Sequence, residues 1–202
     1  MGKTMKKVKE TDNLIREISV NAIRALGEEE SSRKFELSFS SEEPYERWFG
    51  VEILDHSDGC IDLTRLSEIG CVLFNHNRDV VIAKINKVWT KDKRGYAEIE
   101  FDTDEQSEVI YQKVKSGTLK GVSIGYRICS TEEVAVNQVS QDARFKGPCT
   151  IAKRWFPYEI SIVSVPADST VGVGRDLEEI EDTDKRSLSY YEAIVQVNSN
   201  SI

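Results

Sequence analysis

The sequence has no long hydrophobic run. None of its stretches approaches the roughly 18 to 20 consecutive apolar residues that a membrane-spanning helix needs. Its first residues, MGKTMKKVKE, also lack the apolar core of a secretory signal. We therefore expect an intracellular protein that does not bind in or on a membrane.

An excess of basic residues is also missing. Lys and Arg together number 27 against 35 Asp and Glu, which gives a net charge of −8. Proteins that bind nucleic acid or anionic membranes neutralise phosphates with clustered lysines and arginines. The charge balance argues against both kinds of partner.

Closely spaced cysteine pairs are absent as well. The four cysteines, Cys60, Cys71, Cys129 and Cys149, form no C-x-x-C motif, and the chain has only two histidines. Structural zinc sites usually draw their ligands from such pairs. We therefore predict no metal site, and free thiols of a reducing compartment.

The 202 residues, 39% of them hydrophobic, suffice for one domain with a proper core. Residues 1–32 are predicted to form an N-terminal extension, with a basic arm and then a helix over 13–26, where apolar residues recur at helical spacing. The main domain is expected over residues 33–170. Residues 171–202 are predicted to be an acidic tail.

Short extended segments dominate the predicted domain. Apolar patterns and turn residues predict strands at 34–40, 48–54, 72–74, 80–89, 96–101, 119–129 and 158–165. The first two are expected to be adjacent, and 80–89 should form a hairpin with 96–101. A helix is predicted between a cap at Asp102–Asp104 and Gly117. The pattern indicates a mainly β fold with helices (α+β), a barrel or a sandwich.

Two residues of this pattern could carry nucleophilic chemistry. His76 ends an apolar strand, and an imidazole, with its ordinary pKa of about 6.5, suits proton transfer at neutral pH. Ser123 lies on the strand face opposite Val122 and Ile124, beside Gly125, whose small size would admit a substrate or another backbone. The alternatives are a structural or surface histidine and a barrel strand bent at its glycines.

A serine becomes a useful nucleophile beside a base that a third group holds in place. Glu159 is a candidate third group because it opens an otherwise apolar strand. If buried, its carboxylate needs a hydrogen-bond donor such as an imidazole N–H. A solvent-facing glutamate at a strand edge is the alternative.

Together these segments resemble the prohead (capsid maturation) proteases of tailed bacteriophages, distant relatives of herpesvirus assemblin. The resemblance covers roughly Phe35 to Ser169 and rests on FNHNR around His76, GVSIGY around Ser123 and EISIVSVPA from Glu159, in that order. It implies that His76 and Ser123 are catalytic and that Glu159 is the third member. Assemblin uses two histidines, so His56 is the alternative third member. The implied fold is a closed or partly open β-barrel of about six or seven strands.

The resemblance also implies a function. We expect a serine endopeptidase without a cofactor that cuts the phage scaffold and major capsid proteins, and itself, inside the immature capsid in the host cytoplasm. Self-cleavage is expected before about Arg33 or after about Thr170. The alternatives are a non-enzymatic assembly module with the same barrel, and a host or prophage peptidase that acts outside assembly. The sequence is also compatible with a homo-oligomer.

Overall fold

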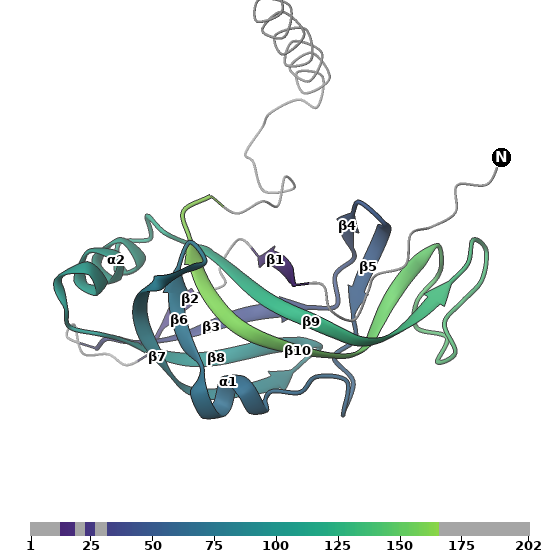
Figure 1. Cartoon of the computed structure of the whole chain (residues 1–202), viewed down its shortest axis with the longest axis horizontal. Coiled ribbons are helices and arrows are strands. Elements are labelled where there is room, and N and C mark those ends of the chain that lie inside the picture. Colours follow the sequence, from purple (N-terminus) through teal and green to yellow (C-terminus); the bar gives the residue numbers. More distant parts are fainter. Residues whose placement is uncertain (1–12, 19–22, 27–31, 166–202) are drawn as a thin grey trace, which may run out of the picture. The chain divides into compact units, whose positions relative to one another are not determined.

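The computed structural model describes residues 13–18, 23–26 and 32–165 (Figure 1). The whole predicted basic arm and the whole acidic tail lie outside these residues. Within them, no helix is long and apolar enough to cross a membrane.

The elements are strands with two short helices between them. In chain order they are β1 (Leu14–Ile18), β2 (Ile23–Ala25), β3 (Lys34–Ser41), β4 (Tyr45–Arg47), β5 (Gly50–Leu54), α1 (Thr64–Ile69), β6 (Cys71–Phe74), β7 (Asn77–Lys91), β8 (Arg94–Phe101), α2 (Glu105–Lys115), β9 (Gly121–Val134) and β10 (Cys149–Val163).

The ten described strands form one sheet. Eight of them follow the order β1-β9-β10-β6-β7-β8-β3-β2, while β5 pairs with β10 and β4 pairs with β5. The sheet curls, so that β3 contacts both β1 and β9 although it is paired with neither (Figure 1). The mainly β class with helices is confirmed. The curled sheet agrees with a partly open barrel, with eight strands along its path where six or seven were expected.

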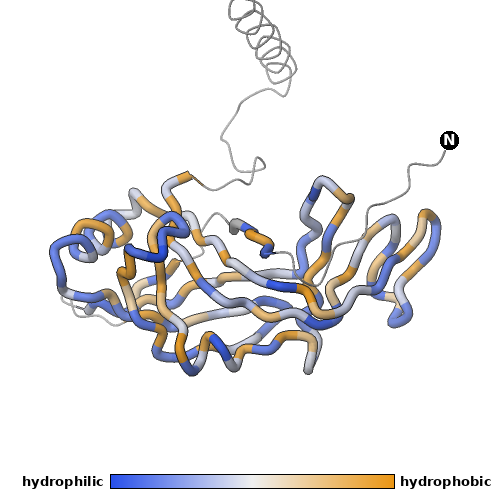
Figure 2. The backbone as a smooth tube through the Cα atoms, viewed as in Figure 1, coloured by the Kyte–Doolittle hydropathy of each residue, from blue (hydrophilic) through white to orange (hydrophobic). Residues whose placement is uncertain are grey.

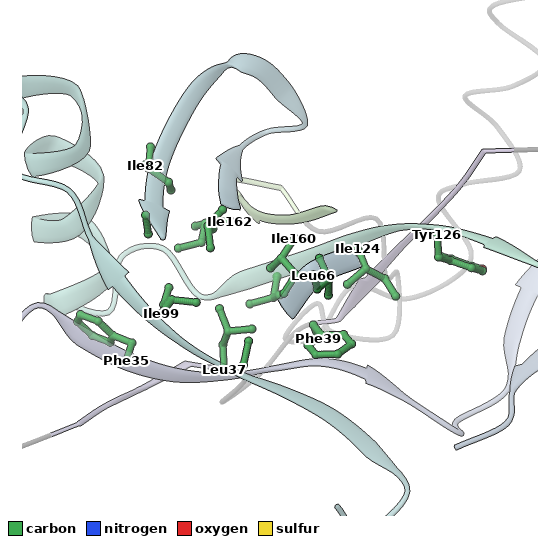
Figure 3. Packing of buried hydrophobic residues seen from close by; sticks show 14 of the residues in the cluster. Phe35, Leu37, Phe39, Leu66, Ile82, Ile99, Ile124, Tyr126, Ile160 and Ile162 are labelled. Atoms are coloured by element: carbon green, nitrogen blue, oxygen red, sulfur yellow. The ribbon is translucent and has the colours of Figure 1, made fainter. Parts of the chain in front are cut away.

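The strands bury alternate side chains in a main core, and a smaller separate cluster includes Ile53 and Ile151. Figure 3 shows Phe35, Leu37 and Phe39 of β3 across from Ile124 of β9 and Ile160 of β10, and all five are buried. The colours in Figure 2 alternate along several strands for the same reason. These apolar side chains point to the concave side of the sheet. The polar side chains that alternate with them on β9 and β10 therefore lie on the opposite, outer face.

The predicted hairpin and helix are confirmed. Strands β7 and β8 pair antiparallel. Helix α2 begins after Asp104, whose side chain accepts hydrogen bonds from the backbone N–H groups of Gln106 and Ser107. These elements could be predicted because their signals are local in the sequence.

The helix predicted over 13–26 is wrong. Residues of this segment form β1, which pairs antiparallel with β9, and β2, which pairs with β3. Leu14 and Arg16 are buried while Ile15 is 42% exposed, which is the alternation of a strand. The free edges of β9 and β3 offered the backbone hydrogen bonds that override a weak helical pattern in a short segment.

The predicted adjacency of the strands at 34–40 and 48–54 is also not found. Strand β3 pairs with β8 and β2, whereas β5 pairs in parallel with β10 through Ile53 and Ile151. A parallel pairing between segments almost one hundred residues apart leaves no local signal in the sequence.

Candidate active site

His76 lies in the two-residue turn between β6 and β7. The turn residues Asn75 and His76 have φ angles of 51° and 59°, the positive values that a tight hairpin turn requires. The turn is fastened to β10: the backbone N–H of His76 donates to Oγ of Ser161 (3.2 Å), and that of Asn75 to the carbonyl of Ile162 (3.0 Å). The imidazole is therefore held over the outer face of β10.

Ser123 lies on β9, directly opposite Ser161 of β10. Its neighbours Val122 and Ile124 belong to the core, as the strand pattern predicted, so Ser123 is on the other face. Its Oγ lies 2.7 Å from Nε2 of His76. The structure thus brings together two residues that are 47 positions apart in the sequence.

Glu159 completes the arrangement from β10. Its Oε1 lies 2.5 Å from Nδ1 of His76. The pairing of β9 and β10 shifts register between Pro157 and Glu159, which makes Tyr158 the extra residue of a bulge. Bulges turn the side chains that follow them, and this one precedes the carboxylate that reaches the imidazole.

Gly125 makes room for that carboxylate. It pairs with Glu159 across the two strands. A Cβ atom at position 125 would lie 2.7 Å from Cγ of Glu159 and 2.6 Å from the ring of Tyr158. The sequence predicted that the small residue admits a substrate or another backbone, and the structure shows side chains of β10 in that place.

The two contacts of His76 fix its protonation pattern. A carboxylate only accepts hydrogen bonds, so Nδ1–H donates to Glu159 and leaves Nε2 as the acceptor for the hydroxyl of Ser123. The side chains of His76 and Glu159 are 19% and 11% exposed, which limits competition by water. This arrangement can draw a proton from a serine hydroxyl and stabilise the resulting imidazolium.

His56, the alternative third member, lies elsewhere. Its Nδ1–H donates to the carbonyl of Leu54 (2.8 Å), and its Nε2 accepts from the hydroxyl of Ser40 (2.7 Å). Burial lowers the pKa of His56 to about 4, so it is neutral at pH 7. The hydrogen-bond partners of this second histidine ring are a hydroxyl and a backbone carbonyl, so it has no carboxylate in the place that Glu159 takes on His76.

A cleft of about 510 Å³ adjoins the candidate site. Tyr158 and Glu159 line it, together with Asn13 and apolar residues of the α1–β7 region. Three arginines, Arg65, Arg78 and Arg127, also line it and add positive charge, which no pattern in the sequence predicted. Two of the three stand within a few residues of His76 and Ser123 in the sequence. In the described ranges, no group of three or more His, Cys, Asp or Glu side chains could hold a metal ion.

Comparisons with known proteins identify the family of the chain. A relative, the major capsid protein of Halomonas phage phiHAP-1, is 36% identical to the chain over 151 residues. The match covers 73% of this chain and 24% of the relative, so the chain spans about a quarter of that protein's length. No solved structure matches. The profile of the caudovirus prohead serine protease family matches residues 56–186, which include His76, Ser123 and Glu159. Because this match spans more than half of the sequence, the chain belongs to the caudovirus prohead serine protease family.

Proposed function

We propose that this protein is a serine endopeptidase that cleaves scaffold or capsid protein segments, and its own chain, during phage head maturation. The observation that carries the proposal is the continuous contact Glu159–His76–Ser123, at 2.5 Å and 2.7 Å. No metal or organic cofactor takes part in this chemistry.

The reaction follows from the contacts. Oγ of Ser123 attacks the carbonyl carbon of the scissile peptide while Nε2 of His76 takes the hydroxyl proton. His76 then gives this proton to the leaving amine, and an ester to Ser123 remains. Water attacks that ester with its proton going to His76, and the proton returns to Ser123 as the acid product leaves. Glu159 stays ionised and stabilises the imidazolium in both steps.

The family and the relative named as a major capsid protein support a role in head assembly. We therefore place the protein inside the immature capsid in the host cytoplasm, with scaffold and capsid proteins as substrates. Residues 33–170 would be the protease domain, and residues 1–32 and 171–202 would be segments open to self-cleavage.

A second candidate function is a non-enzymatic assembly module. Two observations favour it: the relative's name refers to a capsid protein, and the hydroxyl of Ser123 is fully buried. An assembly module, however, does not need a carboxylate at Nδ1 of His76 together with a serine hydroxyl at Nε2 of the same ring.

Co-expression with the scaffold and capsid proteins separates the two functions. Wild-type protein should shorten these partners, and Ser123→Ala should leave them at full length. Ser107→Ala is the matched control because it removes a buried serine hydroxyl in α2, outside the site. Processing that continues undiminished with Ser123→Ala would exclude Ser123 as the nucleophile.

A further inference from the structure

Ser123 has no exposed surface although a nucleophile must meet its substrate. Strand β9 has β10 on one side and β1 on the other. In the second pairing Arg16 lies opposite Ile124, and Oγ of Ser123 lies 3.2 Å from the carbonyl oxygen of Arg16. A segment of the chain itself therefore covers the nucleophile.

We propose that the edge of β9 is the binding site for extended peptide substrates, and that β1 occupies it as a built-in substitute which blocks the enzyme until β1 leaves. The proposal rests on the proposed function, because it assumes that Ser123 attacks a peptide.

The position of β1 is the one a substrate needs. Peptides often bind to a free strand edge by backbone pairing, as an added strand. Without β1, the edge of β9 beside Ser123 is free, because β10 pairs with the opposite edge. A carbonyl within hydrogen-bond distance of the nucleophile is also where the scissile carbonyl must lie. The Arg16 carbonyl meets this condition.

The contact with Arg16 is nevertheless unproductive. The hydroxyl of Ser123 has one proton and two acceptors, Nε2 of His76 at 2.7 Å and the Arg16 carbonyl at 3.2 Å. A hydrogen bond to the carbonyl competes with proton transfer to His76. It also directs the carbonyl oxygen, rather than the electrophilic carbon, toward Oγ. Strand β1 therefore resembles a bound substrate and opposes its own cleavage.

The side chains of β1 explain how the strand is held. Leu14 joins the core, and Arg16 is only 2% exposed. The Arg16 guanidinium is the polar anchor of the strand. It donates to the backbone carbonyl of Glu43 and lies 5.2 Å from the ring centre of Tyr45. The buried carboxylate of Glu52 adds a favourable charge interaction.

The buried surroundings of Arg16 also show why β1 can be released. Within the described part of the chain, Nη1 of Arg16 and Oε2 of Glu52 are buried without a hydrogen-bond partner. Buried groups of this kind oppose binding because they lose their contacts with water. A five-residue strand with an incompletely satisfied anchor is suited to exchange with another peptide.

The test is the rate at which a fluorophosphonate, which reacts with activated serines, labels Ser123 in the full-length protein. Leu14→Asp places a charge in the core and Arg16→Ala removes the anchor, so both should release β1. Each should raise the labelling rate about 10-fold or more, since the rate follows the fraction of uncovered molecules. Val109→Asp, at a half-exposed position of α2, should leave the rate unchanged.

A synthetic peptide of residues 11–21 completes the experiment. It should slow the labelling of both variants toward the wild-type rate, whereas a scrambled peptide should not. Equal labelling of wild type and variants, with no effect of the peptide, would overturn the role of β1 and leave the proposed function standing. Failure of the probe to label Ser123 in every protein would overturn both. Arg16→Ala keeps the core residue Leu14 and decides the question if Leu14→Asp does not fold.

Discussion

Oε1 of Glu159 and Nδ1 of His76 lie 2.5 Å apart, on the side of the imidazole opposite Ser123. The carboxylate comes from the C-terminal part of β10, and the histidine comes from a turn that Ser161 of the same strand holds by a hydrogen bond. Strand β10 thus positions both His76, the base, and Glu159, the group that orients it. This shared support makes the relation between the two residues sensitive to small changes in β10 and in its neighbour β9.

The charge of Glu159 should matter more than its shape. Glu159→Gln keeps the size of the side chain but removes the charge that stabilises the imidazolium, so peptide cleavage should fall by about 10²- to 10⁴-fold. The measurement is kcat/KM on one peptide substrate.

His56→Gln is the matched control for this change. The structure places His56 against Ser40 and Leu54, so the folded variant should cleave at close to the wild-type rate. A crippled His56→Gln beside a nearly normal Glu159→Gln would contradict the assignment of Glu159.

Gly125 should be needed for activity more than for folding. In Gly125→Ala the new methyl group would press on Cγ of Glu159 and on the ring of Tyr158. Because a displacement of about 1 Å at a catalytic group can cost about 10²-fold, cleavage should fall by roughly 10- to 100-fold while the protein stays folded.

Gly95→Ala provides the comparison. Its methyl group would clash with Phe39 and Ser40 in the core, so it should lower the melting temperature and leave the activity of the folded molecules unchanged. If Gly125→Ala loses only stability, the close fit between Gly125 and Glu159 has no part in catalysis.

Stability should decrease on the acid side because of His56. Burial lowers its pKa from 6.5 to about 4 in the folded protein, so the unfolded chain binds the proton more tightly. The stabilisation that neutral His56 gives the folded protein is complete above pH 6.5. It is lost as the pH falls toward 4, which lowers the free energy of unfolding by about 3 kcal/mol in all. Urea unfolding of wild type and His56→Gln at several pH values measures how the free energy of unfolding of each protein changes with pH.

Between pH 6.5 and 4, the free energy of unfolding of His56→Gln should change less than that of wild type, since the other titrating groups are shared by both proteins. Parallel curves would mean that His56 keeps its ordinary pKa in the folded state.

Self-cleavage should occur in the terminal segments. Paired strands, including β1 and β2, hold their backbone in the sheet, so cuts are expected outside these strands, before about Arg33 or after about Thr170. Mass spectrometry of stored wild-type protein locates the cuts, and Ser123→Ala should remain intact. Cuts within residues 34–163, which contain the paired strands from β3 to β10, would contradict these limits.

Local patterns predicted the parts of the fold that local forces determine. The hairpin of β7 and β8 and the capped helix α2 follow from turn residues and caps near each element. The strand alternation around Ser123 likewise predicted which side chains leave the core. The residue types suggested the pairing of Ser123 with His76, and the resemblance implied the same pair.

Other features depend on partners far along the chain. The segment of β1 is short, and its apolar residues fit a helix as well as a strand, so only the free edge of β9 decides between them. The contact of Glu159 with His76 depends on the bulge at Tyr158 and on the absence of a side chain at Gly125. The burial of Arg16 against β4 and β5 residues left no signal in the sequence at all.

The central claim is that Ser123 and His76 act as one unit in peptide cleavage. It is tested most directly by kcat/KM of wild type, Ser123→Ala, His76→Ala and the double variant on a peptide that spans a mapped self-cleavage site. Each single variant should lose about 10³-fold or more, and the double variant should lose no more than the worse single one, because removing either member already disables the pair. Losses that multiply in the double variant, or a single variant that keeps most of its activity, would contradict the account.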